Sequence, residues 1–345
     1  MLSEGDEPNL DPRCRGQSWL RADPNPRLAT HERHASESRP LSGDLRQGTY
    51  SIVARDPSSG ELGVAVESHW FSVGSVVPWA APGIGAVATQ SIAEPAYGPR
   101  LLDRIAAGQA VGDALDELLA ADQQARFRQV AAVDARGTVA VHTGDGCIPH
   151  AGHAEGEGFC AQANLMASQD VWPAMVRAFA AAEGRLARRL LTSLEAGEAA
   201  GGDVRGRQSA ALLVVPAEGE GWRKVIDLRV EDHREPLEEM ARLLDLSDAY
   251  ALAAEGDELA GAGRHEQAAE RYRRAAALAP DSDELLFWAG LALAQHGDLE
   301  GALERLRRAM GIHPGWRELL ARLDPEIAPG AEPAREALGI GRFSR

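Results

Sequence analysis

The pattern of hydrophobic and polar positions between residues 49 and 232 alternates between two periods, one typical of strands and one typical of helices. Runs of β-branched, aromatic and other apolar residues, separated by turn residues, predict strands over 49–54, 62–68, 85–91, 129–134, 139–143, 159–164, 209–215 and 225–230. Apolar residues at helical spacing predict helices over 99–107, 111–121, 171–182 and 186–195. This order predicts two antiparallel sheets with helices outside them, a four-layer αββα sandwich of the α+β class.

The helical pattern of the C-terminal region repeats itself. Residues 263–280 align with residues 297–314, an offset of 297 − 263 = 34 residues. This period is typical of tetratricopeptide repeats, in which small residues let two helices pack closely and a proline ends the second helix. The prediction is two repeats, 249–282 and 283–316, with a capping helix over 316–323. Such repeats have a structural role, for example in dimerisation, or form a concave groove that binds a partner protein.

The first 48 residues fit neither pattern. They mix arginine, proline and aspartate and lack the apolar core of a signal peptide. Three interpretations stay open: a disordered leader, a propeptide, or a misassigned start of the chain. The predicted organisation is a leader over 1–48, a sandwich domain over 49–232, a linker helix over 233–248, repeats over 249–323 and a tail over 324–345.

Composition narrows the functional classes. The 36 Lys plus Arg residues against 52 Asp plus Glu residues give 36 − 52 = −16, and an acidic surface repels nucleic acids and anionic membranes. No apolar run reaches the roughly 18 residues of a membrane helix, so we expect a soluble, cytoplasmic protein without a membrane partner. Three cysteines are too few for a disulfide framework. Lys224 is the only lysine, which disfavours any mechanism that needs a catalytic lysine.

Six blocks of sequence resemble a known bacterial and archaeal family. The blocks are 49–56, 63–66, 68–74, 85–90, 97–100 and 201–210. Together they resemble the Ntn-hydrolase-like domain of unknown function numbered one thousand and twenty-eight, over residues 49–232. Relatives in the wider superfamily include proteasome β-subunits and glycosylasparaginase. The resemblance therefore implies the αββα fold and an N-terminal nucleophile.

Thr49 is the nucleophile that the resemblance implies. In the family the Thr-Tyr-Ser-Ile stretch usually follows the initiator methionine, whereas here Gly48 precedes Thr49, as glycine does in proteasome precursors that cleave themselves. A threonine hydroxyl needs a base, and a free α-amine has a pKa of roughly 7.7 to 8.0, whereas an amide nitrogen is not basic. Thr49 is therefore a nucleophile only if the bond before it is cut. The structural alternative is that Thr49 simply begins a strand.

Proteasome sites use a lysine to lower the pKa of the nucleophile. No lysine lies between residues 49 and 215 here, so another cationic residue would have to supply this electrostatic effect. His69, just after the second predicted strand, is the first candidate, and Arg205 or Arg207 is the alternative. A histidine at the end of a strand is also common as a packed or exposed residue.

Polar residues at predicted strand ends are candidates for oxyanion stabilisation and substrate contact. A tetrahedral oxyanion needs fixed donors, and the side-chain amide of Asn164 donates without carrying charge. Thr89 and Gln90 are further candidates, and Ser51 lies on the same strand face as Thr49. Each of them is equally well explained as a capping or satisfied buried polar residue.

A glycine-rich stretch before the strand at 209–215 carries Asp203, Arg205, Arg207 and Ser209, which we take as candidates for substrate contact. Arginine side chains suit a substrate carboxylate because they donate two parallel hydrogen bonds. A salt bridge between Asp203 and Arg205 that fixes the loop is the structural alternative.

A metal site is a further alternative. Cys147, His150, His153 and Cys160 offer zinc-binding atoms at short spacings, but the spacing matches no zinc motif closely. We therefore predict neither a metal nor another cofactor.

The leading hypothesis is an Ntn-type amidohydrolase that cleaves a small amide or peptide, with Thr49 as nucleophile and its freed amine as base. The alternative is a binding or assembly module without turnover, in which the repeats recruit a protein partner. Because Ntn sandwiches often associate and helical repeats add a second adhesive surface, we expect a homo-oligomer.

Overall fold

The computed structural model describes residues 48–343, so the predicted leader, apart from Gly48, lies outside the described residues. Its strands are β1 (Thr49–Arg55), β2 (Leu62–Ser68), β3 (Pro78–Ala81), β4 (Gly85–Ser91), β5 (Arg128–Asp134), β6 (Val139–Thr143), β7 (Gly152–Gly156), β8 (Phe159–Asn164), β9 (Ser209–Val215) and β10 (Ile226–Val230). Its α-helices are α1 (Tyr97–Ala106), α2 (Val111–Ala121), α3 (Val171–Ala181), α4 (Leu186–Ala199), α5 (Pro236–Gly261), α6 (His265–Leu278), α7 (Asp283–Gln295), α8 (Leu299–Ile312), α9 (Gly315–Arg322) and α10 (Ala331–Leu338).

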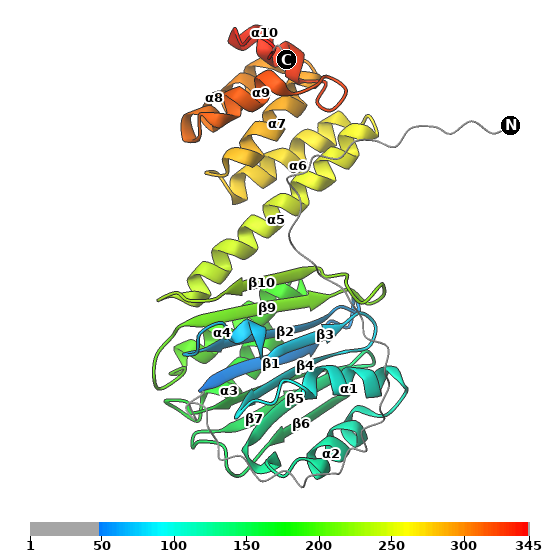
Figure 1. The fold of residues 1–345 in the computed structure, drawn as a ribbon, viewed down its shortest axis with the longest axis vertical. Coiled ribbons are helices and arrows are strands. Elements are labelled where there is room, and N and C mark those ends of the chain that lie inside the picture. Colours follow the sequence, from blue (N-terminus) through cyan, green and yellow to red (C-terminus); the bar gives the residue numbers. More distant parts are fainter. Residues whose placement is uncertain (1–47, 344–345) are drawn as a thin grey trace, which may run out of the picture. The chain divides into compact units, whose positions relative to one another are not determined.

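The strands form two antiparallel sheets that pack face to face (Figure 1). The larger sheet has the order β10-β9-β2-β1-β8-β7, and the smaller has the order β3-β4-β5-β6. Both neighbours of β1 in its sheet run antiparallel to it, so the start of β1 lies beside the ends of β2 and β8. This arrangement decides which side chains surround Thr49.

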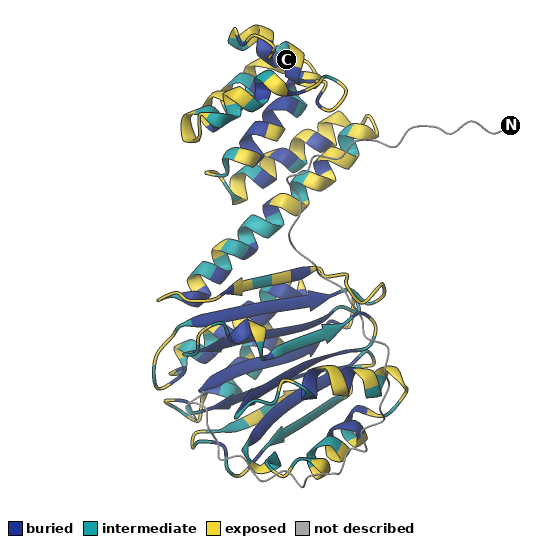
Figure 2. Cartoon of the chain, viewed as in Figure 1, coloured by how far each residue is buried: buried dark blue, intermediate teal, exposed yellow. Residues whose placement is uncertain are grey.

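Helices cover the outer face of each sheet. Helices α3 and α4 pack on the larger sheet, and α1 and α2 pack on the smaller one. Because each sheet is covered on both faces, strands such as β1 and β2 are buried almost throughout, as their dark blue colour in Figure 2 shows. The four-layer αββα sandwich predicted from the sequence is confirmed.

Two strands of the sandwich carry too weak a pattern to be predicted. Strand β3 begins at Pro78, and β7 reads Gly-His-Ala-Glu-Gly, so neither has the β-branched content of a typical strand. Both are edge strands of their sheets. Proline and polar residues are tolerated at sheet edges, where one row of backbone groups needs no strand partner.

The C-terminal helices pack as pairs, α5 with α6 and α7 with α8. In each pair, one helix has a glycine where a side chain of the other helix leaves no space for a Cβ atom. A Cβ atom at Gly256 would lie 2.7 Å from the Tyr272 ring, and one at Gly290 would lie 2.8 Å from the Leu306 side chain. A further helix, α10, forms within the region that the sequence pattern leaves as a tail.

Helix α5 belongs to two hydrophobic cores. Near its start, Leu237, Met240 and Leu244 join the core between the larger sheet and its helices. Further along, Ala249 is buried in a separate cluster with residues of α6 and α7. The helix therefore continues across the boundary that we predicted between residues 248 and 249. No helix within residues 48–343 combines the length and the apolar character that crossing a membrane requires.

Candidate active site

Three strand ends meet at Thr49. The register pairs Thr49 with Ser68 at the end of β2 and with Asn164 at the end of β8. Thr49 is 2% exposed, and Ser68 and Asn164 are fully buried. The hydroxyl oxygens of Thr49 and Ser68 are 3.0 Å apart. A nucleophile candidate thus has a second hydroxyl group within hydrogen-bond distance.

The carbonyl oxygen of Gly48, in the peptide bond before Thr49, accepts hydrogen bonds from three side chains. Oγ1 of Thr49 donates to it at 2.6 Å, Oγ of Ser68 at 2.5 Å and Nη2 of Arg205 at 2.9 Å. Fixed donors around a carbonyl oxygen are the arrangement that stabilises negative charge when the carbonyl is attacked. The donors on this carbonyl, besides Thr49, are Ser68 and Arg205, whereas the amides of Gln90 and Asn164 donate to the Thr49 carbonyl.

Asp203 holds Arg205 in this position. Its carboxylate accepts from Nε of Arg205 at 3.1 Å and from Nη2 at 2.7 Å, and from the backbone N–H groups of Arg205 and His69. The Asp203 side chain is fully buried. The salt bridge proposed as a structural alternative is therefore present, and it also positions the guanidinium group on the Gly48 carbonyl.

A network of uncharged amides fills the space between the sheets behind Thr49. Nε2 of Gln90 donates to the Thr49 carbonyl at 3.0 Å, and its Oε1 accepts from Ser51 Oγ at 2.6 Å. Oε1 of Gln129 accepts from Gln90 at 2.8 Å and from Asn164 at 3.0 Å. The second amide hydrogen of Asn164 points to the Thr49 carbonyl at 3.4 Å. Both N–H groups of Asn164 are thus occupied within the protein and are not free for an oxyanion.

A second polar cluster lies on the opposite face of the same two strands. Glu67 pairs with Tyr50 across β1 and β2 and is fully buried. The Tyr50 hydroxyl donates to Oε2 of Glu198 at 2.8 Å, and neither oxygen of Glu67 has a hydrogen-bond partner within the described chain. Burial, together with the charges of Glu198 and Asp203, raises the pKa of Glu67 well above its usual range. Protonation of Glu67 is therefore favoured relative to an exposed glutamate.

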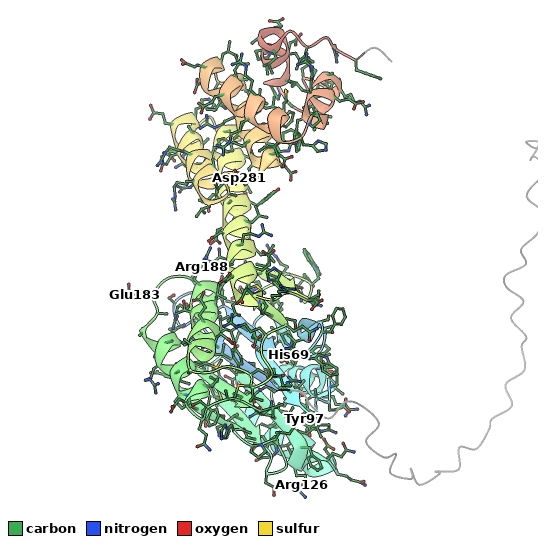
Figure 3. All side chains as sticks on the ribbon, turned by 90° about the vertical axis from the view of Figure 1, so that its left-hand side faces the viewer. His69, Tyr97, Arg126, Glu183, Arg188 and Asp281 are labelled. Atoms are coloured by element: carbon green, nitrogen blue, oxygen red, sulfur yellow. The ribbon has the colours of Figure 1, made fainter. Side chains whose placement is uncertain are left out.

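His69, which is labelled in Figure 3, follows β2. It lines a surface cleft. Its Nδ1–H donates to the carbonyl oxygen of Arg207 at 3.2 Å. The imidazole ring is therefore bonded to the loop before β9 and not to Thr49. The cleft has a volume of about 700 Å³, and Arg207, His233 and Arg234 also line it. The Arg207 guanidinium pairs with Glu198 at 2.5 Å and with Glu235.

Two candidate residues lie away from Thr49. Thr89 precedes Gln90 on β4 and therefore points to the other face of the sheet, where its hydroxyl donates to the Glu94 carbonyl at 3.2 Å. Ser209 donates to the Trp70 carbonyl at 2.5 Å and accepts from a backbone N–H of the turn after β2. These contacts give both hydroxyls a local structural role.

The cysteines and histidines considered for zinc are separately engaged. Burial raises the pKa of both buried thiols, and Cys147 and Cys160 donate to backbone carbonyl oxygens. His150 contacts the Met166 carbonyl, and His153 contacts the Thr143 hydroxyl. Within residues 48–343 there is no cluster of three or more His, Cys, Asp or Glu side chains suited to a metal ion.

The sequence interpretation did not name Ser68, Glu67, Gln129 or Gln162 as site residues. Nε2 of Gln162 donates to Ser51 Oγ at 3.3 Å and so joins the amide network. Gln129 and Gln162 occupy inward-facing positions of otherwise apolar strands, and this break in the pattern is a detectable signal. Ser68 becomes visible only through the register of the hairpin, in which the last residue of β2 faces the first residue of β1. Nothing in the local sequence specifies that register by itself.

Comparison with known proteins agrees with this architecture. Residues 49–240 match the model of the family of unknown function DUF1028, and residues 259–323 match a tetratricopeptide repeat. The crystal structure of protein SPO2555 from Silicibacter pomeroyi, of the same family, is 30% identical, with a TM-score of 0.53 over 57% of this chain and 84% of that one. No curated protein shows significant similarity.

A second solved structure is more distant. Anbu (ancestral beta-subunit) from Yersinia bercovieri is 12% identical, with a TM-score of 0.28 over 53% of this chain and 88% of that one. The family match covers more than half of the residues and begins at Thr49, as the sequence resemblance predicted. This chain belongs to the family of unknown function DUF1028, followed by tetratricopeptide repeats.

Proposed function

We propose that this protein cuts its own Gly48–Thr49 bond and that the mature chain, beginning at Thr49, hydrolyses an amide bond in a small amide or peptide. One observation carries the proposal. The Gly48 carbonyl oxygen lies within hydrogen-bond distance of the Thr49 hydroxyl, the Ser68 hydroxyl and the Arg205 guanidinium group. The nucleophile, its neighbour hydroxyl and a cationic donor converge on one peptide bond.

The self-cleavage step uses these groups as follows. The Thr49 hydroxyl oxygen attacks the Gly48 carbonyl carbon, and its proton passes to the departing amide nitrogen of Thr49. Negative charge on the former carbonyl oxygen is stabilised by Ser68 Oγ–H and by Arg205. The C–N bond breaks and an ester forms. Water then hydrolyses the ester, which releases a Gly48 carboxylate and leaves Thr49 with a free amine and a free hydroxyl.

The freed amine supplies the base that the precursor lacks. With an ordinary pKa of roughly 7.7 to 8.0, an α-amine accepts the hydroxyl proton near neutral pH. The substrate carbonyl then occupies the place of the Gly48 carbonyl. The Thr49 oxygen attacks it, the substrate C–N bond breaks, and the amine leaves with the proton held by the α-amine. Water then hydrolyses the new ester and releases the substrate acid. The only lysine, Lys224, pairs with Asp227 at 3.4 Å in the β9–β10 region, so Arg205 is the cation that we assign to the oxyanion.

Intact-mass analysis of freshly translated precursor tests the self-cleavage. We expect a product of 345 − 48 = 297 residues that begins at Thr49. Thr49→Ala removes the nucleophile and should leave the chain uncut, whereas the matched variant Thr192→Ala, at an exposed position of α4, should mature like the wild type. Wild-type precursor that stays intact, or Thr49→Ala precursor that still matures, contradicts the proposal.

A second candidate function rests on the repeats. Helices α5, α6 and α7 line a cavity of about 240 Å³ that contains Tyr250 and Trp288, and a neighbouring cavity of about 280 Å³ shares Asp257, Tyr272 and Trp288 with it. Tyr250 and Trp288 are 40% and 38% exposed and border the same cavity. Aromatic side chains flanked by carboxylates suit a partner segment with apolar and cationic residues.

A peptide of alternating leucine and arginine tests this second function, with a leucine and glutamate peptide as the comparison. We expect the cationic peptide to bind the full chain and to lose affinity as salt rises. Trp288→Ala should weaken binding at least tenfold, whereas Trp222→Ala, at an exposed tryptophan outside the repeats, should not. Equal binding of the two peptides, or full binding by Trp288→Ala, contradicts a partner site in these cavities.

A further inference from the structure

Gly48 packs against Asp203 with no room for a side chain. A Cβ atom placed on Gly48 would lie 2.5 Å from Oδ2 of Asp203 and 2.8 Å from both Oδ1 and Cγ. The restriction at this position is therefore one of space.

The Asp203 carboxylate is held in its position beside Gly48 by burial and by hydrogen bonds. Its side chain is fully buried, and its two oxygens accept hydrogen bonds from Arg205 and from the backbone N–H of His69. Its backbone also forms an isolated antiparallel bridge with Met166. A shift of the carboxylate away from Gly48 would break the hydrogen bonds that place Arg205 on the Gly48 carbonyl. The site therefore cannot adapt to a larger residue without disturbing its own cation.

The same space serves the precursor and the substrate. In self-cleavage the acyl group on the Thr49 hydroxyl is the glycyl group of Gly48, and in turnover it is the acyl part of the substrate. Both esters involve the same oxygen of Thr49 and the same donors, so the α-carbon of the substrate faces Asp203 as that of Gly48 does. This step rests on the proposed function.

We propose that Asp203 makes this site selective for glycyl substrates, that is, for amides whose acyl α-carbon carries no side chain. The physical reason is a steric clash with a buried, hydrogen-bonded carboxylate. We expect a rate about tenfold lower for an alanyl group, which corresponds to about 1.4 kcal/mol and lies within the usual cost of overpacking a well-packed site.

The first experiment compares self-cleavage of three precursors by intact mass. Wild type and Gln47→Ala should mature at the same rate, and Gly48→Ala should mature at least tenfold more slowly. If the wild type does not mature, the proposed function fails. If the wild type matures and Gly48→Ala keeps pace with it, the proposed function stands and the glycyl selectivity is overturned.

The second experiment uses the mature wild-type enzyme and two fluorogenic amides, acetyl-glutaminyl-glycyl- and acetyl-glutaminyl-alanyl-aminomethylcoumarin, which mimic residues 47 and 48. We expect the glycyl compound to be hydrolysed at least tenfold faster in kcat/KM. Equal rates overturn the proposal.

A third comparison assigns the effect to Asp203. Asp203→Ser removes the carboxylate oxygens that face Gly48 but keeps a hydroxyl oxygen that can accept a hydrogen bond. We compare Asp203→Ser alone with Asp203→Ser combined with Gly48→Ala. Both precursors should be slower than their counterparts with Asp203, but the ratio of the glycyl to the alanyl cleavage rate should fall toward one. A general loss of site structure would slow both precursors equally and leave the ratio unchanged, and that result would overturn the role of Asp203.

Discussion

The space between the two sheets has an apolar half and a polar half. In the apolar half, Val53, Val64 and Val133 pack with alanines at no cost in hydrogen bonding. In the polar half, a few residues further along the strands, Gln90, Gln129 and Asn164 are equally buried but are tied together by hydrogen bonds. Each half is filled by side chains, so the difference between them is one of chemistry rather than of packing.

This difference shows how the fold holds a reactive residue in place. Side-chain amides have donors and acceptors but no charge, so they can be buried without the large cost of desolvating an ion. Here Gln90 of the smaller sheet and Asn164 of the larger sheet donate to the Thr49 carbonyl and fix the start of β1. Three variants test the contrast between the two halves, and a fourth tests the Glu67 cluster on the opposite face of β1 and β2; they follow in order of expected effect.

Ser68→Ala should have the largest effect, on self-cleavage. Besides Thr49, Ser68 and Arg205 donate to the Gly48 carbonyl oxygen, and the substitution removes the first of these two donors. Loss of a single oxyanion donor typically lowers a rate by about 10²–10³. Mass spectrometry of the precursor over time measures the rate, and Ser75→Ala, at an exposed serine, is the control. A normal rate for Ser68→Ala would place the oxyanion donors elsewhere.

Gln129→Leu should disrupt the hydrogen-bond network of the polar half. The amides of Gln90 and Asn164 each lose an acceptor in a buried site, and an unsatisfied buried donor costs about 1–3 kcal/mol. We expect a loss of about 3 kcal/mol in the free energy of unfolding, measured by urea denaturation, together with slower self-cleavage. Unchanged self-cleavage in a folded Gln129→Leu protein would show that the network does not position Thr49.

Val133→Ala is the matched change in the apolar half. It removes buried methyl groups and should lower the free energy of unfolding by about 2 kcal/mol through lost burial and a small cavity. Self-cleavage at a temperature where the variant is fully folded should stay at the wild-type rate. A parallel loss of self-cleavage would mean that the two halves are not functionally distinct.

Glu67→Gln should have the smallest effect, and that effect should depend on pH. Because burial raises the pKa of Glu67 in the folded chain, the folded state keeps a proton that the unfolded state loses above about pH 4.3. Stability from this group is thus present at low pH and declines as pH rises, by at most about 1.4 kcal/mol per unit. Thermal unfolding at pH 5, 6 and 7 should show Glu67→Gln gaining on the wild type at each step.

Glu220→Gln, at an exposed glutamate, is the control for that titration and should show no such trend. A constant difference between Glu67→Gln and wild type across the three pH values would mean that Glu67 titrates normally in the folded chain.

The fold was largely predictable because it depends on local signals. The strand from Thr49 and the helices of the sandwich follow from runs and periods of apolar residues, and the repeats follow from a period of 34 residues. The candidate site was only partly predictable. Thr49, Gln90 and Arg205 are candidates from the sequence, and the structure places Arg205 on the Gly48 carbonyl and Gln90 on the Thr49 carbonyl.

The sequence did not predict the register of the strands or the contacts between residues that lie far apart along the chain. Thr89 and Gln90 are neighbours, and only the pairing of β4 decides that Gln90 faces Thr49 and Thr89 faces the helices. The contact of Arg205 with Gly48 joins residues 157 positions apart, which no short pattern encodes. Ser68 carries no special signal in the sequence, although its hydroxyl lies within hydrogen-bond distance of that of the proposed nucleophile.

Helix α5 has a practical consequence for anyone who wishes to study the sandwich alone. A truncation at the end of the family match, residue 240, removes Leu244 from the core that it helps to fill. A cut after Gly261 keeps that residue but leaves Ala249 and Gly256 without the helix that covers them. An isolated sandwich should therefore end between Leu244 and Ala249, where the helix passes from one core to the other.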